Sequence, residues 1–170
     1  AGLYGKYVIE ELAGIPVDES NFRVLIPRKL IEESLDAAPS TVKLFDRPGE
    51  KEYLVGYDEV HFDPGSAAVR VLDHGTQQER PPVTADLVRL ASVTESCGNI
   101  HFQSTALVAS DVPQTIADSY RLFVGLLFCS KPVVTGTFRT MGFRPMFEML
   151  AAVRGGAEEL RKKPLAIFDA

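Results

Sequence analysis

Polar residues follow the strand-like apolar runs of this chain, at the points where a parallel α/β protein holds its ligands. The run at residues 60–62 is followed by Asp63, Pro64, Gly65 and Ser66. Three later runs are followed by Gln103, Ser104, Thr105, Thr135, Gly136, Thr137 and Asp169. Hydroxyl and amide groups orient a ligand, and a carboxylate binds a cation or moves a proton. We therefore expect a substrate-binding role for Asp63, Pro64, Gly65, Ser66, Gln103 and Thr135, and we assign no catalytic residue.

Each of these positions also has a purely structural interpretation. Asp-Pro-Gly-Ser is ordinary turn chemistry, because proline restricts φ and glycine adopts positive φ. Gln103 and Thr135 could simply satisfy backbone groups at strand ends. The residue types alone leave both interpretations open.

The sequence predicts neither a metal site nor an activated nucleophile. His61 and His101 occupy matching places in adjacent strand-like runs, but no Cys or carboxylate completes a tetrahedral set at recognisable spacing, and His74 belongs to a turn. Cys97 and Cys129 lack CxxC spacing, so we expect buried or partly buried thiols. No Gly-x-Ser-x-Gly elbow is present.

The elements that must position these residues read as alternating strands and helices. The strand-like runs "VHF", "IHFQS", "PVVTG" and "LAIFD" are separated by helical segments, a pattern typical of βαβ units and a parallel sheet. We predict an α/β fold in which residues 59–170 form the first half, about four βα units, of a (β/α)8 TIM barrel. Residues 1–58 are predicted as a preceding cap of a small helix and a β-hairpin. An open doubly wound sheet is the rival, although no GxGxxG or P-loop follows a strand.

Local patterns predict further detail. We expect weak helix over residues 3–13, a strand at "FRVLIP", a helix opening at Pro27, a hairpin around Gly75 and a helix capped by Thr84. Later helices are predicted to open at Asp111–Pro113 and at Pro145. A stripe on the first of these is expected to pack against the sheet; it consists of Ile116, Tyr120, Phe123 and Leu127.

Composition and charge exclude several classes of function. Hydrophobic residues make up 45% of the chain and the net charge is −5, so the electrostatic basis for binding nucleic acid is missing. The most apolar run, residues 122–129, is too short to span a bilayer, and we expect a cytoplasmic protein. The chain starts without Met and stops after an apolar run at residues 165–168, so we expect a fragment completed by further chain or by self-association.

An ordered series of segments resembles the N-terminal portion of the trimethylamine methyltransferase family. The segments are "RVLIPRKLIEESLDAAPSTVKLFDR", "VHFDPGSAAVRVLD", "ERPPVTADLVRLA", "NIHFQST", "DVP", "KPVVTGT" and "EMLAAVRGGAEELRKKPLAIF". No single segment is specific, but their order is. The likeness covers the chain from about residue 20.

The resemblance implies a (β/α)8 barrel that moves a methyl group from a methylated amine or a betaine to the cobalt of a corrinoid on a separate protein. Some family members carry pyrrolysine in a part that would lie beyond Ala170. The family usually shows Gly-Pro-Gly-Gly after the first strand. Here Pro64 and Gly65 match while Asp63 and Ser66 depart, which points to a different substrate. Phe62, Asp63 and Phe102 are candidates to contact an ammonium group, although their strand-end positions favour a place in the core for Phe62 and Phe102.

Two other functions remain open. A non-catalytic half-barrel could bind a small molecule or a partner protein. A different barrel enzyme, such as a relative of the zinc-dependent methyltransferases, would instead hold a metal ion.

Overall fold

A computed structural model describes residues 14–21 and 23–169 of the chain. The chain divides into two compact units, Ala1–Ser40 and Thr41–Ala170. The predicted helix over residues 3–13 lies outside the described residues. Within the described residues, no helix is both long and apolar enough to cross a membrane.

The described residues of the first unit form two short strands and one helix. Strand β1 (Val17–Asp18) pairs antiparallel with β2 (Arg23–Val24), so the strand expected at "FRVLIP" shortens to two residues. Helix α2 (Arg28–Ala37) confirms the predicted helix, with Pro27 directly before its first residue.

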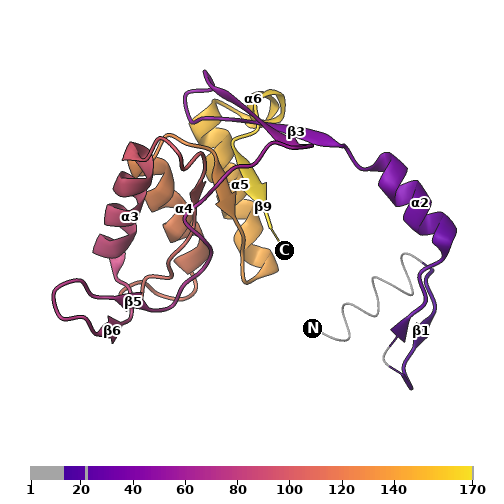
Figure 1. Cartoon of the computed structure of the whole chain (residues 1–170), viewed down its shortest axis with the longest axis horizontal. Coiled ribbons are helices and arrows are strands. Elements are labelled where there is room, and N and C mark those ends of the chain that lie inside the picture. Colours follow the sequence, from indigo (N-terminus) through magenta and orange to yellow (C-terminus); the bar gives the residue numbers. More distant parts are fainter. Residues whose placement is uncertain (1–13, 22, 170) are drawn as a thin grey trace. The chain divides into compact units, whose positions relative to one another are not determined.

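The second unit contains the remaining elements (Figure 1). Its strands are β3 (Thr41–Phe45), β4 (Glu52–Gly56), β5 (Val71–Leu72), β6 (Glu79–Arg80), β7 (Gln103–Ser104), β8 (Val133–Thr135) and β9 (Ala166–Phe168). Its helices are α3 (Thr84–Ser96), α4 (Ala117–Phe128), α5 (Thr140–Arg154) and α6 (Ala157–Lys162).

A three-stranded parallel sheet, in the order β7-β8-β9, organises this unit, and helices connect its strands. This confirms the predicted alternation of strands and helices. The expected first strand, residues 60–62, is not part of a regular strand. It lies beside the residues that precede β7, since the Phe62 carbonyl accepts the N–H groups of His101 and Phe102 at 3.1 Å. Ala68 makes a parallel bridge with Leu107 further along.

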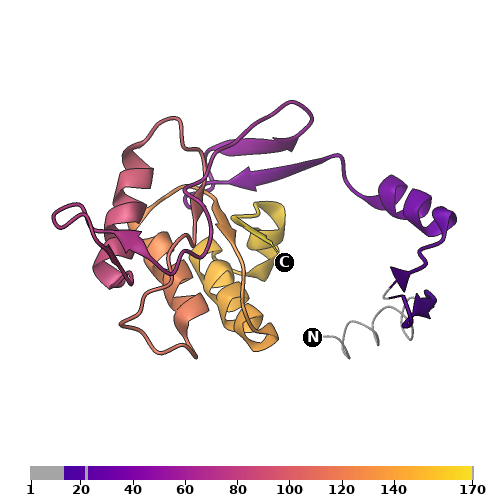
Figure 2. The same ribbon diagram turned by 60° about the horizontal axis from the view of Figure 1, so that its bottom comes forward.

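One face of the sheet is covered by helices. Val133 and Leu165 pack there in a buried cluster with residues of α4, α5 and α6, namely Leu122, Leu126, Met146, Leu150 and Leu160. Helices α3, α4 and α5 lie side by side on this face (Figures 1 and 2). Residues 102 and 134 point to the opposite face because side chains alternate along a strand.

The hairpin β3–β4 covers the opposite face at the amino-terminal ends of the strands. Leu44 and Tyr53 form a buried cluster with Phe102, against which Val134 and Ile167 pack. The Phe45 and Arg47 N–H groups donate to Pro164 at 2.7 Å and Ser130 at 2.6 Å, which precede β9 and β8. This packing makes the hairpin part of the second compact unit, which begins at Thr41. The hairpin leaves the carboxyl ends of the strands open.

Three helix boundaries differ from the predictions. Thr84 is the first residue of α3 and not its cap, because Asp111 accepts the Thr84 N–H at 2.9 Å. Asp111 thus serves α3, and α4 begins six residues later, at Ala117. Pro145 lies inside α5, which begins at Thr140. A Cβ at Gly142 would overlap the Thr137 hydroxyl, so this glycine lets the first turn of α5 pack on the strand end.

Three of the four residues of the stripe expected to face the sheet are exposed: Ile116, Phe123 and Leu127, at 50%, 44% and 53%. The fourth, Tyr120, is partly buried and packs against the cluster of Leu87, Ala109 and Val124. The residues of α4 that are buried are instead Ala117, Arg121, Leu122, Val124, Gly125 and Leu126. A buried cation displaces the most apolar stripe because its partners lie at the ends of the strands, as described below.

Lys131 holds the loop that follows α3. Its Nζ donates to the carbonyl oxygens of Thr94, Cys97 and Ile100, so all three ammonium protons are used in hydrogen bonds.

We expect Lys131→Met to lower the free energy of unfolding by about 2–3 kcal/mol, because three partly buried carbonyls lose a charged donor. Urea unfolding of the purified protein measures this loss. Lys162→Met is the control, since the Lys162–Glu159 pair is exposed and should contribute less than about 0.5 kcal/mol. Equal effects of the two substitutions would contradict this account.

Arg80 ties the confirmed hairpin β5–β6 to α3. Its guanidinium donates to Asp86 at 2.7 and 2.9 Å and to Asp73 at 3.0 Å. These hydrogen bonds are the main reason that the pKa of each carboxyl falls to about 2.

The lowered pKa values predict a pH-dependent stability. Because the folded pKa lies below the unfolded value of 3.8, the stabilisation by Asp73 and Asp86 is complete above about pH 4 and is lost as the pH falls through 2. We expect Arg80→Met to melt at a lower temperature than the unmodified protein at pH 7. The difference should shrink between pH 4 and pH 2. Thermal unfolding across this range checks it, and a difference that is constant with pH would refute it.

Candidate functional site

A cavity of about 260 Å³ opens at the carboxyl ends of the three parallel strands. Its lining comes from the ends of all three strands, from α4 and from the turn after residue 62: Ser66, Ala67, Thr105, Arg121, Gly136, Thr137, Phe138 and Asp169. This is the edge of the sheet at which the sequence predicted a ligand site.

Two glycine-dependent features shape the cavity. A Cβ at Gly136 would come within 2.7 Å of the Asp169 carboxylate, so the strand ends of β8 and β9 approach closely only because this residue is glycine. Gly65 adopts φ +103°, which favours glycine, and turns the chain back toward β7. The Gly65 carbonyl then accepts a hydrogen bond from the Ser104 hydroxyl.

Among the four turn residues that the sequence singled out, only Ser66 lines the cavity. Asp63 is exposed and its Oδ1 accepts the Gly65 N–H at 2.7 Å, the geometry of an ordinary turn. Pro64 and Gly65 are absent from the cavity wall. The turn therefore shapes the cavity through its backbone conformation. Asp63, one of the two residues that differ from the Gly-Pro-Gly-Gly pattern, does not face the cavity.

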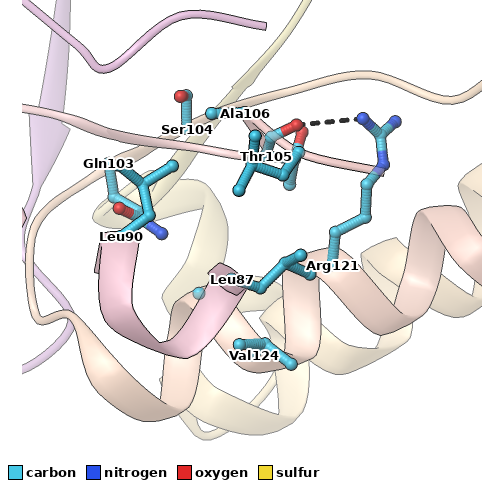
Figure 3. A pocket seen from close by; sticks show the side chains of 10 residues that line it. Leu87, Leu90, Gln103, Ser104, Thr105, Ala106, Arg121 and Val124 are labelled. Carbon is cyan, nitrogen blue, oxygen red and sulfur yellow. Dashed lines mark hydrogen bonds between the residues drawn. The ribbon is translucent and has the colours of Figure 1, made fainter. Parts of the chain in front are cut away.

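Gln103 and Thr135 lie on the helix-covered face and not in the cavity. Gln103 is 4% exposed and lies against Gly125 of α4, where a Cβ would be 3.0 Å from its Nε2. Figure 3 shows it beside Leu90, in a small pocket between α3, α4 and β7. The Thr135 hydroxyl is 3.1 Å from that of Thr105 and is buried. Alternation along the strands explains why these two predicted residues do not reach the open cavity.

Arg121 is a site residue that the sequence patterns did not single out, as are Asp118 and Phe138. Its side chain is only 4% exposed, and its guanidinium donates to the carbonyls of Thr105 at 2.9 Å and Gly136 at 3.1 Å. Figure 3 shows the bond to Thr105. These carbonyls follow directly after β7 and β8, so Arg121 joins two neighbouring strand ends.

Asp118 completes the network one turn before Arg121. It accepts hydrogen bonds from Arg121 at 2.9 Å, from the Thr137 hydroxyl at 2.8 Å and from the Phe138 N–H at 2.9 Å. The Phe138 ring lies over the Arg121 guanidinium, 4.9 Å from it, and is 67% exposed. The sequence signal for this pair is an Asp and an Arg at i, i+3 spacing in front of a run of apolar residues.

The charges of the site leave a net negative cavity. Asp118 compensates the guanidinium of Arg121, and among the described residues that line the cavity the remaining charged group is Asp169. Backbone geometry fixes Asp169, since its N–H donates to the Thr135 carbonyl at 2.9 Å. A carboxylate beside an exposed aromatic ring suits a cationic ligand.

The two histidines of the strand-like runs meet, but elsewhere. His61 Nδ1 and His101 Nδ1 are 3.1 Å apart, and His61 Nε2 donates to the Leu54 carbonyl at 2.6 Å. Since that carbonyl only accepts, a neutral His61 accepts at Nδ1 from His101. Among the described residues, no three or more His, Cys, Asp or Glu side chains are arranged so that they could hold a metal ion. Phe102 is buried beside them, whereas Phe62 is 63% exposed. The free thiols are buried for Cys129 and partly buried for Cys97, as expected.

Comparison with known proteins gives one family match and two similar relatives. A family model described as trimethylamine methyltransferase (MTTB) matches residues 8–168. The trimethylamine methyltransferase MttB of Desulfitobacterium hafniense (strain DSM 10664 / DCB-2) is 26% identical over 152 residues, which are 89% of this chain and 31% of that protein. The glycine betaine methyltransferase of Desulfitobacterium hafniense (strain Y51) is 22% identical over 146 residues, 85% of this chain and 30% of that protein. The chain thus spans about a third of the length of these relatives.

Proposed function

The chain belongs to the trimethylamine methyltransferase family, and from that premise we propose that the complete protein demethylates a methylated amine and passes the methyl group to a corrinoid on a separate protein. The donor is a tertiary or quaternary amine, in keeping with the names of the two relatives. We further propose that this chain supplies the N-terminal portion of a (β/α)8 barrel.

The cavity at the carboxyl ends of β7, β8 and β9 is the observation that carries this proposal. Barrel enzymes hold their substrates at this end of the strands. The hairpin β3–β4 covers the other end, through the packing of Leu44 and Tyr53 on Phe102. The three-stranded sheet therefore has an open, polar end at the carboxyl ends of its strands, which supports the proposal.

The reaction requires a cation to be bound and oriented. The acceptor is a nucleophile that shares an electron pair with the methyl carbon, while the electron pair of the breaking C–N bond returns to nitrogen and a neutral amine leaves. Asp169 and the exposed ring of Phe138 would hold the ammonium group. The corrinoid is the second substrate in this scheme, and its cobalt supplies the nucleophilic electron pair.

A methyl-transfer assay with the complete gene product tests the proposal. Reduced cobalamin is incubated with the protein and with trimethylamine, glycine betaine or related amines, and methylcobalamin is followed by its absorbance. We expect one of these donors to support transfer. Failure with every donor would overturn the proposed function, and one equivalent of tightly bound zinc would favour a metal-dependent barrel enzyme instead.

A further inference from the structure

We propose that Asp118 is a specificity-determining positioning residue: by compensating the buried Arg121, it makes the cavity selective for a cation over a neutral ligand of the same shape. This inference rests on the proposed function only in the choice of ligand. No part of it requires methyl transfer.

A buried guanidinium is an unexpected group beneath a site for a cationic substrate. Arg121 lines the cavity, is 4% exposed and lies under the Phe138 ring at 4.9 Å. An uncompensated positive charge at this depth would repel an ammonium group, because water screens it poorly there. It would also weaken the attraction of the opposite ring face for a second cation.

Asp118 removes this conflict without entering the cavity wall. Its carboxylate lies 2.9 Å from the Arg121 guanidinium and is itself 13% exposed, so the pair is neutral as a unit. Once the pair is neutral, the charge of the cavity is that of Asp169. The sign of the net charge in the cavity therefore depends on Asp118, a residue that does not line the cavity.

The same carboxylate also shapes the wall, and this second role must be separated from the first. Asp118 accepts from the Thr137 hydroxyl and from the Phe138 N–H. An Asn at this position keeps a side-chain oxygen for these donors but loses the charge. Asp118→Asn is accordingly the substitution that changes electrostatics with the least change of shape.

Two small probes of equal shape separate the charge from the geometry. Tetramethylammonium is the cation and tert-butanol serves as its neutral counterpart, and binding of each to the complete protein is measured by calorimetry or NMR titration. For Asp118→Asn we expect about a tenfold or greater loss of tetramethylammonium affinity with little change for tert-butanol. The loss should shrink at high salt.

A double substitution provides the matched control. Asp118→Asn combined with Arg121→Gln removes both charges, and we expect it to restore the preference for the cation. Should Arg121→Gln prevent folding, the ratio of the two affinities in Asp118→Asn alone decides the question.

Three results would overturn the inference. The first is an equal loss of affinity for both probes in Asp118→Asn. The second is an unchanged affinity for both probes in that variant. The third is that tetramethylammonium does not bind to the unmodified protein. Cation binding with the predicted response to Asp118→Asn, but without methyl transfer from any donor, would refute the proposed function and leave the inference standing.

Discussion

Asp169→Asn is expected to lower kcat/KM for a quaternary ammonium donor by about a hundredfold or more. The side chain keeps its size but loses the charge that remains in the cavity once Asp118 has compensated Arg121. A unit charge a few ångströms from an ammonium group contributes about 3–4 kcal/mol at the effective dielectric constant of a partly enclosed site. Steady-state methyl transfer by the complete protein, with glycine betaine or trimethylamine as donor, measures the effect.

Asp63→Asn is the matched control for this experiment. Asp63 is also an aspartate near the cavity, in the turn that contributes Ser66 to its wall, but its own side chain is outside the wall and closes the turn through the Gly65 N–H. Asn closes the same turn, so we expect transfer within about twofold of the unmodified protein. Similar losses in the two variants would show that Asp169 has no special role.

Arg121→Met is expected to lower the free energy of unfolding by about 3–5 kcal/mol, the largest effect on stability that we predict. The substitution leaves Asp118 buried without a compensating charge and deprives the Thr105 and Gly136 carbonyls of their donor. Because these carbonyls follow β7 and β8, the two strand ends should also loosen. Chemical unfolding measures the stability, and hydrogen exchange at residues 135–138 reports the loosening.

Arg144→Met controls for the loss of an arginine as such. Arg144 pairs with Glu148 on the surface of α5 and its side chain is 87% exposed. Pairs of this kind contribute at most about 0.5 kcal/mol. A loss below 1 kcal/mol in Arg121→Met would show that the buried network contributes little to stability.

Local sequence patterns predicted which helices and strands form, but they predicted less well the residues at which the helices begin. The helix after Pro27, the hairpin around Gly75 and the parallel strands 133–135 and 166–168 are present. The prediction at Pro145 was wrong because this proline lies inside α5, five residues after the helix begins at Thr140. The helix start predicted at Asp111 was wrong because this carboxylate accepts the N–H at the start of α3, a helix distant in the sequence, while α4 begins at Ala117.

The stripe on α4 shows why hydrophobic periodicity alone was insufficient. Ile116, Phe123 and Leu127 form the more apolar side of the helix, yet they are exposed. Arg121 occupies the buried side because its guanidinium finds three hydrogen-bond acceptors there. These are the Asp118 carboxylate and the Thr105 and Gly136 carbonyls. Asp118 belongs to α4, but the Thr105 and Gly136 carbonyls follow two separate strands, so no pattern within α4 contains all three acceptors.

The sequence by itself determined the family, the alternation of strands and helices, and the edge of the sheet at which polar residues gather. These follow from local propensity and from the order of segments. Only the tertiary structure decided which polar residues face the cavity, because one register of strand alternation places Gln103 and Thr135 among the helices and Asp169 at the open end. It alone also brought Asp118 and Arg121 beneath that end, since the free energy of burying a charge depends on partners that are distant along the chain.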